Sequence, residues 1–164
     1  MGPTFDEPLY VRAGLTFWET RSHGDLLREG TMPLAADVQS LPVRLAELFR
    51  AARFDRDADF EEMLAIARAA NLVFWWLLLA GAWKAGRELG GPWGARLAVA
   101  LIAMEPLLLG HASLATTDLP LAAGLVWLGL TFRVGRDAGP ARRILVPGLW
   151  FAVSLLAKAS AVVL

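Results

Sequence analysis

The 164-residue chain contains no cysteine, so disulfide bonds and thiolate metal sites are excluded. It also has no excess of either charge: 16 Lys and Arg balance 16 Asp and Glu, which argues against a nucleic-acid partner. The first ten residues show no basic stretch followed by an apolar one, so we expect no signal peptide. No uninterrupted apolar run reaches about eighteen residues, the strict criterion for a membrane-spanning helix.

Apolar residues, by contrast, are abundant. They make up 56% of the chain, which includes seven tryptophans, whereas soluble domains are usually about 45–50% apolar. Residues 1–70 carry eight Arg against twelve acidic residues, and residues 71–164 carry eight Lys and Arg against four. We therefore expect two parts: an acidic, water-facing segment (residues 1–69) and an apolar region (residues 70–164).

Four apolar segments stand out in the second part. Because about 20 residues cross the roughly 30 Å hydrocarbon core, each must be extended by a turn or so to span it. The segments predict an all-α, polytopic membrane protein with about four transmembrane helices, and a soluble bundle of buried helices is the alternative. The last residues are apolar too, so we expect a fragment of a longer protein. The four segments cover residues 70–88, 95–113, 117–133 and 144–164.

The charges of the turns predict the orientation. The turns Lys84–Arg96 and Arg133–Arg143 are rich in Lys and Arg, whereas the link Gly110–Asp118 has neither. Basic turns favour the cytoplasmic side, so the link is expected to face outward. Two spans separate the basic turns, so both turns can lie on the cytoplasmic side. Residues 1–69 are then expected on the outer side, together with the link. The sequence thus predicts a multi-pass protein of the cell membrane.

An amphipathic helix is expected within the outer segment, at Pro33–Arg53. Its apolar stripe can lie on the membrane surface or pack on neighbouring helices. Pro42 is expected to kink or split it. The stripe consists of Leu34, Val38, Leu41, Leu45, Leu48, Phe49 and Ala52.

Two sets of acidic residues are candidates for chemistry. Asp6 and Glu7 precede a helical pattern, where a carboxylate can stabilise the helix start or act as a general base. Glu105 lies at the outer end of an apolar span. An ionised group costs about 2.5–3.5 kcal/mol at the bilayer centre, so Glu105 is expected to face a cavity or a partner.

Three further polar residues lie near the predicted outer face. Asp118 can begin the third span as a helix cap, and His111 lies just before it. Lys158 can extend its amine to the interface or pair with an anion such as a phosphate. Glu105, His111 and Asp118 are ligand types that divalent metals use, but their spacing is irregular. A divalent metal is thus an open alternative, and we assign no metal site. Nucleotide-binding, zinc-protease and nucleophile-elbow motifs are absent.

Four stretches, taken in order, resemble one family. Phe5–Pro8 with Ala13–Gly14 looks like an acidic pair opening a first outer loop, and Met32–Ala35 with Leu41–Pro42 looks like a Pro-Pro-Leu stretch. Glu105–Leu121 looks like a second outer loop and the helix after it, and Ala157–Ser160 fits a Lys-Gly/Ser step. Together they resemble the polyprenyl-phosphate-dependent membrane glycosyltransferases of the GT-C fold, which include protein O-mannosyltransferases and aminoarabinose lipid A transferases.

The resemblance implies transfer of a sugar from a polyprenyl phosphate to a lipid, glycan or protein acceptor. It makes Asp6 the base that activates the acceptor, with Glu7 beside it. Glu105, His111 and Asp118 would shape the acceptor and phosphate region, and Lys158 would face the phosphate. This chemistry needs mainly a base and cations for the departing phosphate, and it implies the lipid bilayer and the donor lipid as partners.

Two other functions stay open. A non-catalytic remnant or accessory subunit of the same fold is favoured by two departures from the family. Only five residues precede Asp6, where the family has a span, and Gly30–Met32 stands where the family often carries Lys or His and a first Pro. A transporter fragment, with Glu105 and Asp118 on an ion path, is the third hypothesis.

Overall fold

The computed structural model describes residues 2–163, and all regular secondary structure in that range is helical. The predicted all-α fold class is therefore confirmed. In chain order the elements are α1 (Glu7–Thr20), α2 (Gly24–Arg28), α3 (Pro33–Arg50), α4 (Phe60–Ala70), α5 (Leu72–Ala103), α6 (Pro106–Ala112), α7 (Asp118–Gly135), α8 (Pro140–Ala157) and the short 3-10 helix η1 (Ala159–Val162).

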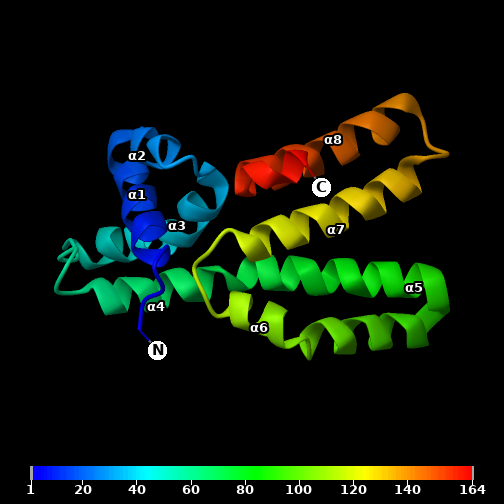
Figure 1. The fold of residues 1–164 in the computed structure, drawn as a ribbon, viewed down its shortest axis with the longest axis horizontal. Helices are drawn as coiled ribbons and strands as arrows, with labels where there is room; N and C mark the ends of the chain where they lie inside the picture. The colour runs from blue at the N-terminus through cyan, green and yellow to red at the C-terminus, as the bar shows by residue number, and fades with distance from the viewer. Residues whose placement is uncertain (1, 164) are drawn as a thin grey trace.

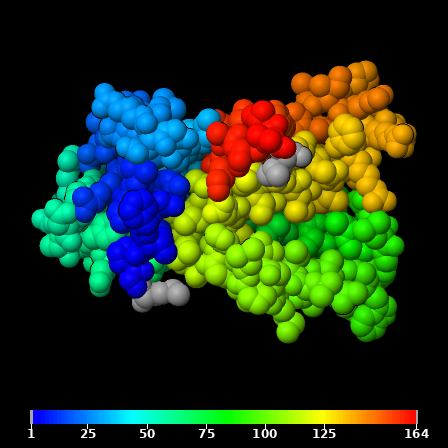
Figure 2. Space-filling view, in the orientation of Figure 1, coloured from blue at the N-terminus to red at the C-terminus, as the bar shows by residue number. Residues whose placement is uncertain are grey.

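The helices form two groups along the long axis of the molecule (Figure 1). Helices α1–α4 gather at one end, and α5, α7 and α8 run away from them as long, roughly antiparallel rods. The space-filling view shows the N-terminal residues collected at that end, with the C-terminal segment lying beside them (Figure 2). The far end consists of two turns, one within α5 and one between α7 and α8.

Helix α5 is a hairpin of two helical arms. Gly90 and Gly91 have non-helical backbone angles, and Gly91 has φ +63°, a conformation that glycine adopts without steric cost. Pro92 then starts the second arm, a position where its missing N–H is not needed. The arms touch through Gly86 and Gly94, whose backbones lie in direct contact. A glycine pair thus lets the chain reverse closely.

Two predicted segments differ from the helices found. The segment predicted at 95–113 is broken at Glu105, because Pro106 has no N–H to continue the ladder and the Glu105 carboxylate accepts a hydrogen bond from the Leu108 amide at 2.6 Å. The segment predicted at 144–164 ends as an α-helix at Ala157, because Lys158 has an extended backbone. By contrast Pro42 does not split its helix, since α3 is continuous from Pro33 to Arg50.

Helix α7 is the central rod of the bundle and contacts both α5 and α8. Gly124 brings it against Ser154 of α8, and the Trp127 ring stacks on Trp150 with 5.4 Å between centroids. On its other side, the Trp127 indole donates a hydrogen bond to the Leu77 carbonyl of α5 at 2.9 Å. Small residues and one indole therefore hold the three rods together.

Helix α3 packs with the face opposite its apolar stripe. Its small and polar residues are buried against α1 and α4, whereas Leu45, Leu48 and Phe49 are exposed, Phe49 to 88%. At the start of the stripe, Leu34 and Val38 pack on clusters that include residues of α5, α7 and α8. The stripe therefore begins on the bundle and continues beyond it without a partner among the described residues.

The surface of the bundle is strongly apolar. Most exposed large hydrophobic side chains lie on α5–α8, for example Trp93 (76%), Leu145 (68%) and Leu101 (64%). Contiguous surfaces of this kind are rare on soluble monomers. Two helical stretches, Phe60–Ala103 and Pro140–Ala157, are long and apolar enough to cross a membrane. Helix α7 is not among them, and Asp118 and Arg133 lower its mean hydropathy.

Gly86→Ala tests the α5 hairpin. The added Cβ would meet the backbone of Gly94, which cannot move aside as a side chain can, so we expect a loss of about 1–3 kcal/mol in unfolding free energy. The matched control is Gly129→Ala on α7, where a Cβ meets nothing within 4 Å and where alanine is expected to be neutral or stabilising. Denaturant unfolding of the detergent-solubilised chain, followed by circular dichroism, compares them. Equal stability of the two variants would contradict the close contact.

Candidate functional site

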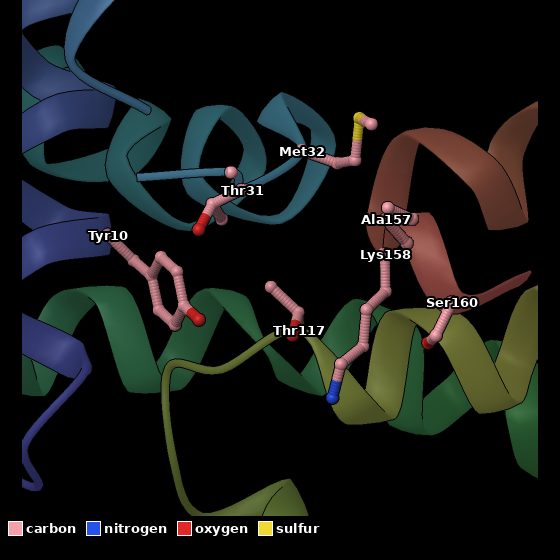
Figure 3. A pocket seen from close by; sticks show the side chains of 9 residues that line it. Tyr10, Thr31, Met32, Thr117, Ala157, Lys158 and Ser160 are labelled. Carbon is pink, nitrogen blue, oxygen red and sulfur yellow. The ribbon is translucent and has the colours of Figure 1, made fainter. Parts of the chain in front are cut away.

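A cavity of about 230 Å³ lies where α1, the start of α3, the start of α7 and the end of α8 meet (Figure 3). The Tyr10 hydroxyl and the Thr117 side chain point toward one another across it, and Lys158 extends from its far side toward α7. Its lining comes from four separate stretches of the chain: Tyr10, Gly30, Thr31, Met32, Thr117, Ala157, Lys158, Ala159 and Ser160.

Three of the predicted site residues meet beside this cavity. The Lys158 ammonium donates a hydrogen bond to Asp118 Oδ1 at 2.6 Å, and both side chains are about 40% exposed. His111 Nδ1 lies 3.5 Å from Asp118 Oδ2, too poorly aligned for a hydrogen bond, and is buried without another partner in the described residues. The extended backbone at Lys158 ends α8 and turns the residue toward the N-terminus of α7, where the helix dipole also favours Asp118.

Tyr10 forms the α1 side of the site, and Asp6, one turn earlier, is not among the residues that line the cavity. Asp6 is exposed at the position before the first turn of α1, and its side chain makes no capping hydrogen bond. Tyr10 lies one turn further along with its ring largely buried. Burial raises the pKa of the Tyr10 phenol and the negative charge of Asp6 raises it further, while Thr117 and Lys158 act in the opposite direction. The charge of Asp6 therefore influences the phenol that lines the cavity.

Glu7, the second acid of the pair, is fully buried and points away from solvent. Its carboxylate receives hydrogen bonds from Arg68 on both oxygens, at 2.8 and 2.7 Å, and from the backbone amides of Thr4 and Ala115, at 2.9 and 2.8 Å. The side chain therefore joins α1, α4 and the loop before α7. In this arrangement Glu7 is suited to holding the site together, because its lone pairs are already occupied.

The same contacts set the protonation of Glu7. Burial alone would raise its pKa, but the hydrogen bonds from Arg68, Thr4 and Ala115 together with the Arg68 charge outweigh it and lower the pKa to about 2. Hence Glu7 stays ionised at neutral pH and is a weak base. Of the acidic pair, Asp6 is the exposed member, and its side chain makes no capping hydrogen bond.

A buried amide network supports the loop that carries Thr117 and Asp118. The Gln39 amide donates to Asn71 Oδ1 at 3.1 Å and to the Thr116 carbonyl at 2.8 Å. Asn71 in turn donates to the carbonyls of His111 and Leu114, at 3.1 and 2.7 Å. Uncharged side chains from α3 and the α4–α5 junction thus fix the path of the chain into α7.

Glu105 lies apart from the other predicted residues. It caps α6 through the Leu108 amide, and within residues 2–163 it has no recorded contact with His111, Asp118 or Lys158. Residues 2–163 also contain no group of three His, Asp or Glu side chains placed to hold a metal ion.

Sequence reasoning missed several residues that build the site. These residues are Tyr10, Arg68, Gln39 and Asn71. Gln39 lies on the buried face of α3 beside other polar residues, and Asn71 lies at the α4–α5 junction, where buried polar groups are expected to be hydrogen-bonded. Comparison of the chain with family models, curated proteins and solved structures finds no match.

Glu7→Gln and Asp6→Asn separate the two acids. Glu7→Gln removes the only charge of a fully buried side chain that joins α1, α4 and the loop before α7, and with it the charge-assisted bonds from Arg68, so we expect a loss of about 3 kcal/mol in unfolding free energy. Asp6→Asn changes an exposed side chain without a recorded hydrogen bond and is expected to stay within about 0.5 kcal/mol. Denaturant unfolding at neutral pH measures both. An equally small effect of Glu7→Gln would contradict the anchoring role.

The stability contributed by Glu7 should depend on pH. Its folded-state pKa, about 2, lies below the ordinary value of 4.5, so this stability is complete above about pH 4.5 and is lost as the pH falls toward 2. We expect wild type to lose more stability than Glu7→Gln between pH 5 and pH 2. Urea unfolding at a series of pH values checks this, and parallel curves for the two proteins would contradict it.

Proposed function

We propose that this chain takes part in transferring a sugar from a polyprenyl phosphate to a lipid, glycan or protein acceptor at the outer face of a membrane. One observation carries the proposal. The cavity is lined from the four regions whose residues resemble the membrane glycosyltransferases: Tyr10 beside the acidic pair, Met32, Thr117 and Ala157–Ser160. These regions are far apart in sequence, so their convergence is a property of the fold.

The reaction needs a base for the acceptor hydroxyl and a cation for the departing phosphate, and Asp6 and Lys158 are suited to these roles. The hydroxyl oxygen of the acceptor attacks the anomeric carbon of the sugar, and Asp6 accepts the proton that this hydroxyl loses. The bond between that carbon and the phosphate oxygen breaks, and the phosphate leaves with the electron pair. Lys158 stabilises the phosphate charge. Asp118 holds the Lys158 ammonium at the cavity edge until the more highly charged phosphate competes for it.

The bundle is proposed to cross the membrane four times, through the two arms of α5, through α7 and through α8. The apolar surface of α5–α8 supports this, as do the two stretches of spanning length. The turns that hold Lys84–Arg96 and Arg133–Arg143 lie at the same end of the bundle, and the cavity lies at the other (Figure 1). Basic turns at one end fit the cytoplasmic side, which makes the cavity end the outer one.

The exposed stripe of α3 fits the same arrangement. Leu34 and Val38 pack on the bundle, and Leu45, Leu48 and Phe49 continue the apolar face past it. An unpartnered apolar face beside a membrane bundle is stabilised at the boundary of headgroups and acyl chains. We place α3 along the outer membrane surface, with α1 on its other side.

Asp6→Asn tests the proposed base. In membranes from cells expressing the complete reading frame, it should reduce release of polyprenyl phosphate from a radiolabelled polyprenyl-phosphate sugar by about 10²-fold or more, with protein abundance unchanged. The matched control is Asp25→Asn, an exposed acid on α2 that should leave transfer intact. Transfer retained by Asp6→Asn would remove the base and favour a non-catalytic subunit.

Single cysteines test the orientation, since the chain has none of its own. Cysteines at the exposed positions Phe5 and Ser113 should react with an impermeant maleimide in intact cells, and those at Gly90 and Gly139 should react only after permeabilisation. Labelling of Phe5→Cys and Ser113→Cys from opposite sides would separate the parts of the site and contradict the proposal.

A further inference from the structure

We propose a second binding site, for the headgroup of an anionic phospholipid, at the end of the bundle opposite the candidate active site. This inference rests on the membrane arrangement proposed above but not on the sugar-transfer reaction. It starts from a cavity of about 280 Å³ between α5, α7 and α8, next to the α7–α8 turn. The cavity is lined by Lys84, Trp127, Thr131, Val134, Gly135, Arg142, Val146 and Trp150.

Cations and aromatic rings are combined in this cavity. The stacked Trp127 and Trp150 rings form one wall, and the Lys84 ammonium lies 5.7 Å from the Trp127 ring centroid. Arg142 approaches from the first turn of α8, and Thr131 adds a hydroxyl. Gly135 lets the turn fold closely, since a Cβ there would lie 3.2 Å from the Arg142 carbonyl oxygen. The rings thus offer an apolar wall beneath a positively charged rim.

The positive charge at this rim is not neutralised by the protein. Lys84, Arg136, Arg142 and Arg143 form no ion pair within the described part of the chain, where the recorded ion pairs involve other residues. A second cavity, of about 430 Å³, lies at the same turn and is lined by Phe132, Arg136 and Arg143. Four basic side chains around two cavities are therefore available to bind an anionic ligand.

The surroundings favour a lipid over a free phosphate ion. Phe132, Ile144 and Leu145 are exposed beside the cationic rim, Ile144 to 65% and Phe132 and Leu145 to 68% each. A headgroup phosphate bound by Lys84 and Arg142 would place its acyl chains along these side chains and along the Trp127–Trp150 wall. Basic pockets between membrane helices on the cytoplasmic side bind anionic headgroups in this way, and tryptophans favour the headgroup level.

This site is separate from the candidate active site. Trp127 and Lys84 lie in the parts of α7 and α5 that lead to the turns, whereas Asp118 begins α7 and Lys158 follows α8 at the opposite end of the bundle. A lipid here would bridge α5 to the α7–α8 hairpin, whose N-terminal α8 turn is otherwise exposed. The bound headgroup would therefore stabilise the hairpin at the cytoplasmic surface.

The experiment uses the complete chain, purified in detergent and titrated with palmitoyl-oleoyl phosphatidylglycerol or phosphatidylcholine, with bound lipid counted by native mass spectrometry. We expect a one-to-one phosphatidylglycerol complex that phosphatidylcholine does not form. Lys84→Gln with Arg142→Gln should weaken this complex about 30-fold. Arg87→Gln with Arg96→Gln removes the same charge from the same end but outside the cavity, and it should leave the complex intact. Asp6→Asn should also bind the lipid normally.

Equal binding of the two lipids by wild type, or equal losses in both double variants, would overturn the site. Glycerol 3-phosphate should not displace the lipid at millimolar concentration, and displacement would show that a soluble phosphate is the ligand. Should the cavity variant misfold, wild type remains informative. Brominated phosphatidylglycerol should quench its tryptophan fluorescence more than brominated phosphatidylcholine, and equal quenching would count against the site. Extraction of wild type by alkaline carbonate would instead overturn the membrane arrangement itself.

Discussion

The buried ion pair between Glu7 and Arg68 is the contact on which the arrangement of the site depends. Through it α1 is joined to α4, and the third partner, the Ala115 amide, belongs to the loop that leads into α7. These three segments are far apart in the sequence. A charge in this position is stabilised only while all its partners are present, so the pair specifies one way of docking the N-terminal helices on the bundle. Asp6, the preceding residue, is thereby held at the start of α1.

The neutral network of Gln39 and Asn71 supplies the second part of this joint. It fixes the carbonyls of His111, Leu114 and Thr116, and so the direction in which α7 begins. The Glu7 carboxylate and the side-chain amides of Gln39 and Asn71 therefore all form hydrogen bonds with the backbone of the segment that leads into α7. The cavity lies where these helices meet, with Tyr10 on one side and Lys158 on the other.

The helical class and the position of α7 were predictable, because long apolar segments bounded by charged turns leave few other structures. The breaks at Glu105 and Lys158 were not, since they depend on a local cap and on one extended residue rather than on hydropathy. The burial of α3 was also missed. Its apolar stripe left two placements open, on the membrane surface or against neighbouring helices. The small residues Ala36 and Ser40 on the opposite face allow closer packing on α1, where Gly14 offers no side chain. Among the candidate site residues, the resemblance assigned Asp118 and Lys158 to the phosphate region but predicted no contact between them, whereas the structure joins them in an ion pair. The different burial of Asp6 and Glu7 was not predicted either. Adjacent carboxylates on a helix point in different directions, and sequence alone does not say which one is buried.

In the four-span arrangement proposed above, the reversal at Gly90–Gly91 has a consequence for the thickness of membrane that the bundle would match. The second arm of α5, from Pro92 to Ala103, rises only about 18 Å, well short of the roughly 30 Å of hydrocarbon in an average bilayer. Helix α6 adds about another 10 Å, so the return path reaches the far surface only with both pieces, and Glu105 lies at depth between them. Its cap on the Leu108 amide gives that carboxylate a donor where water is scarce. A short, interrupted return path of this kind favours local thinning of the bilayer around the hairpin, as expected from hydrophobic mismatch.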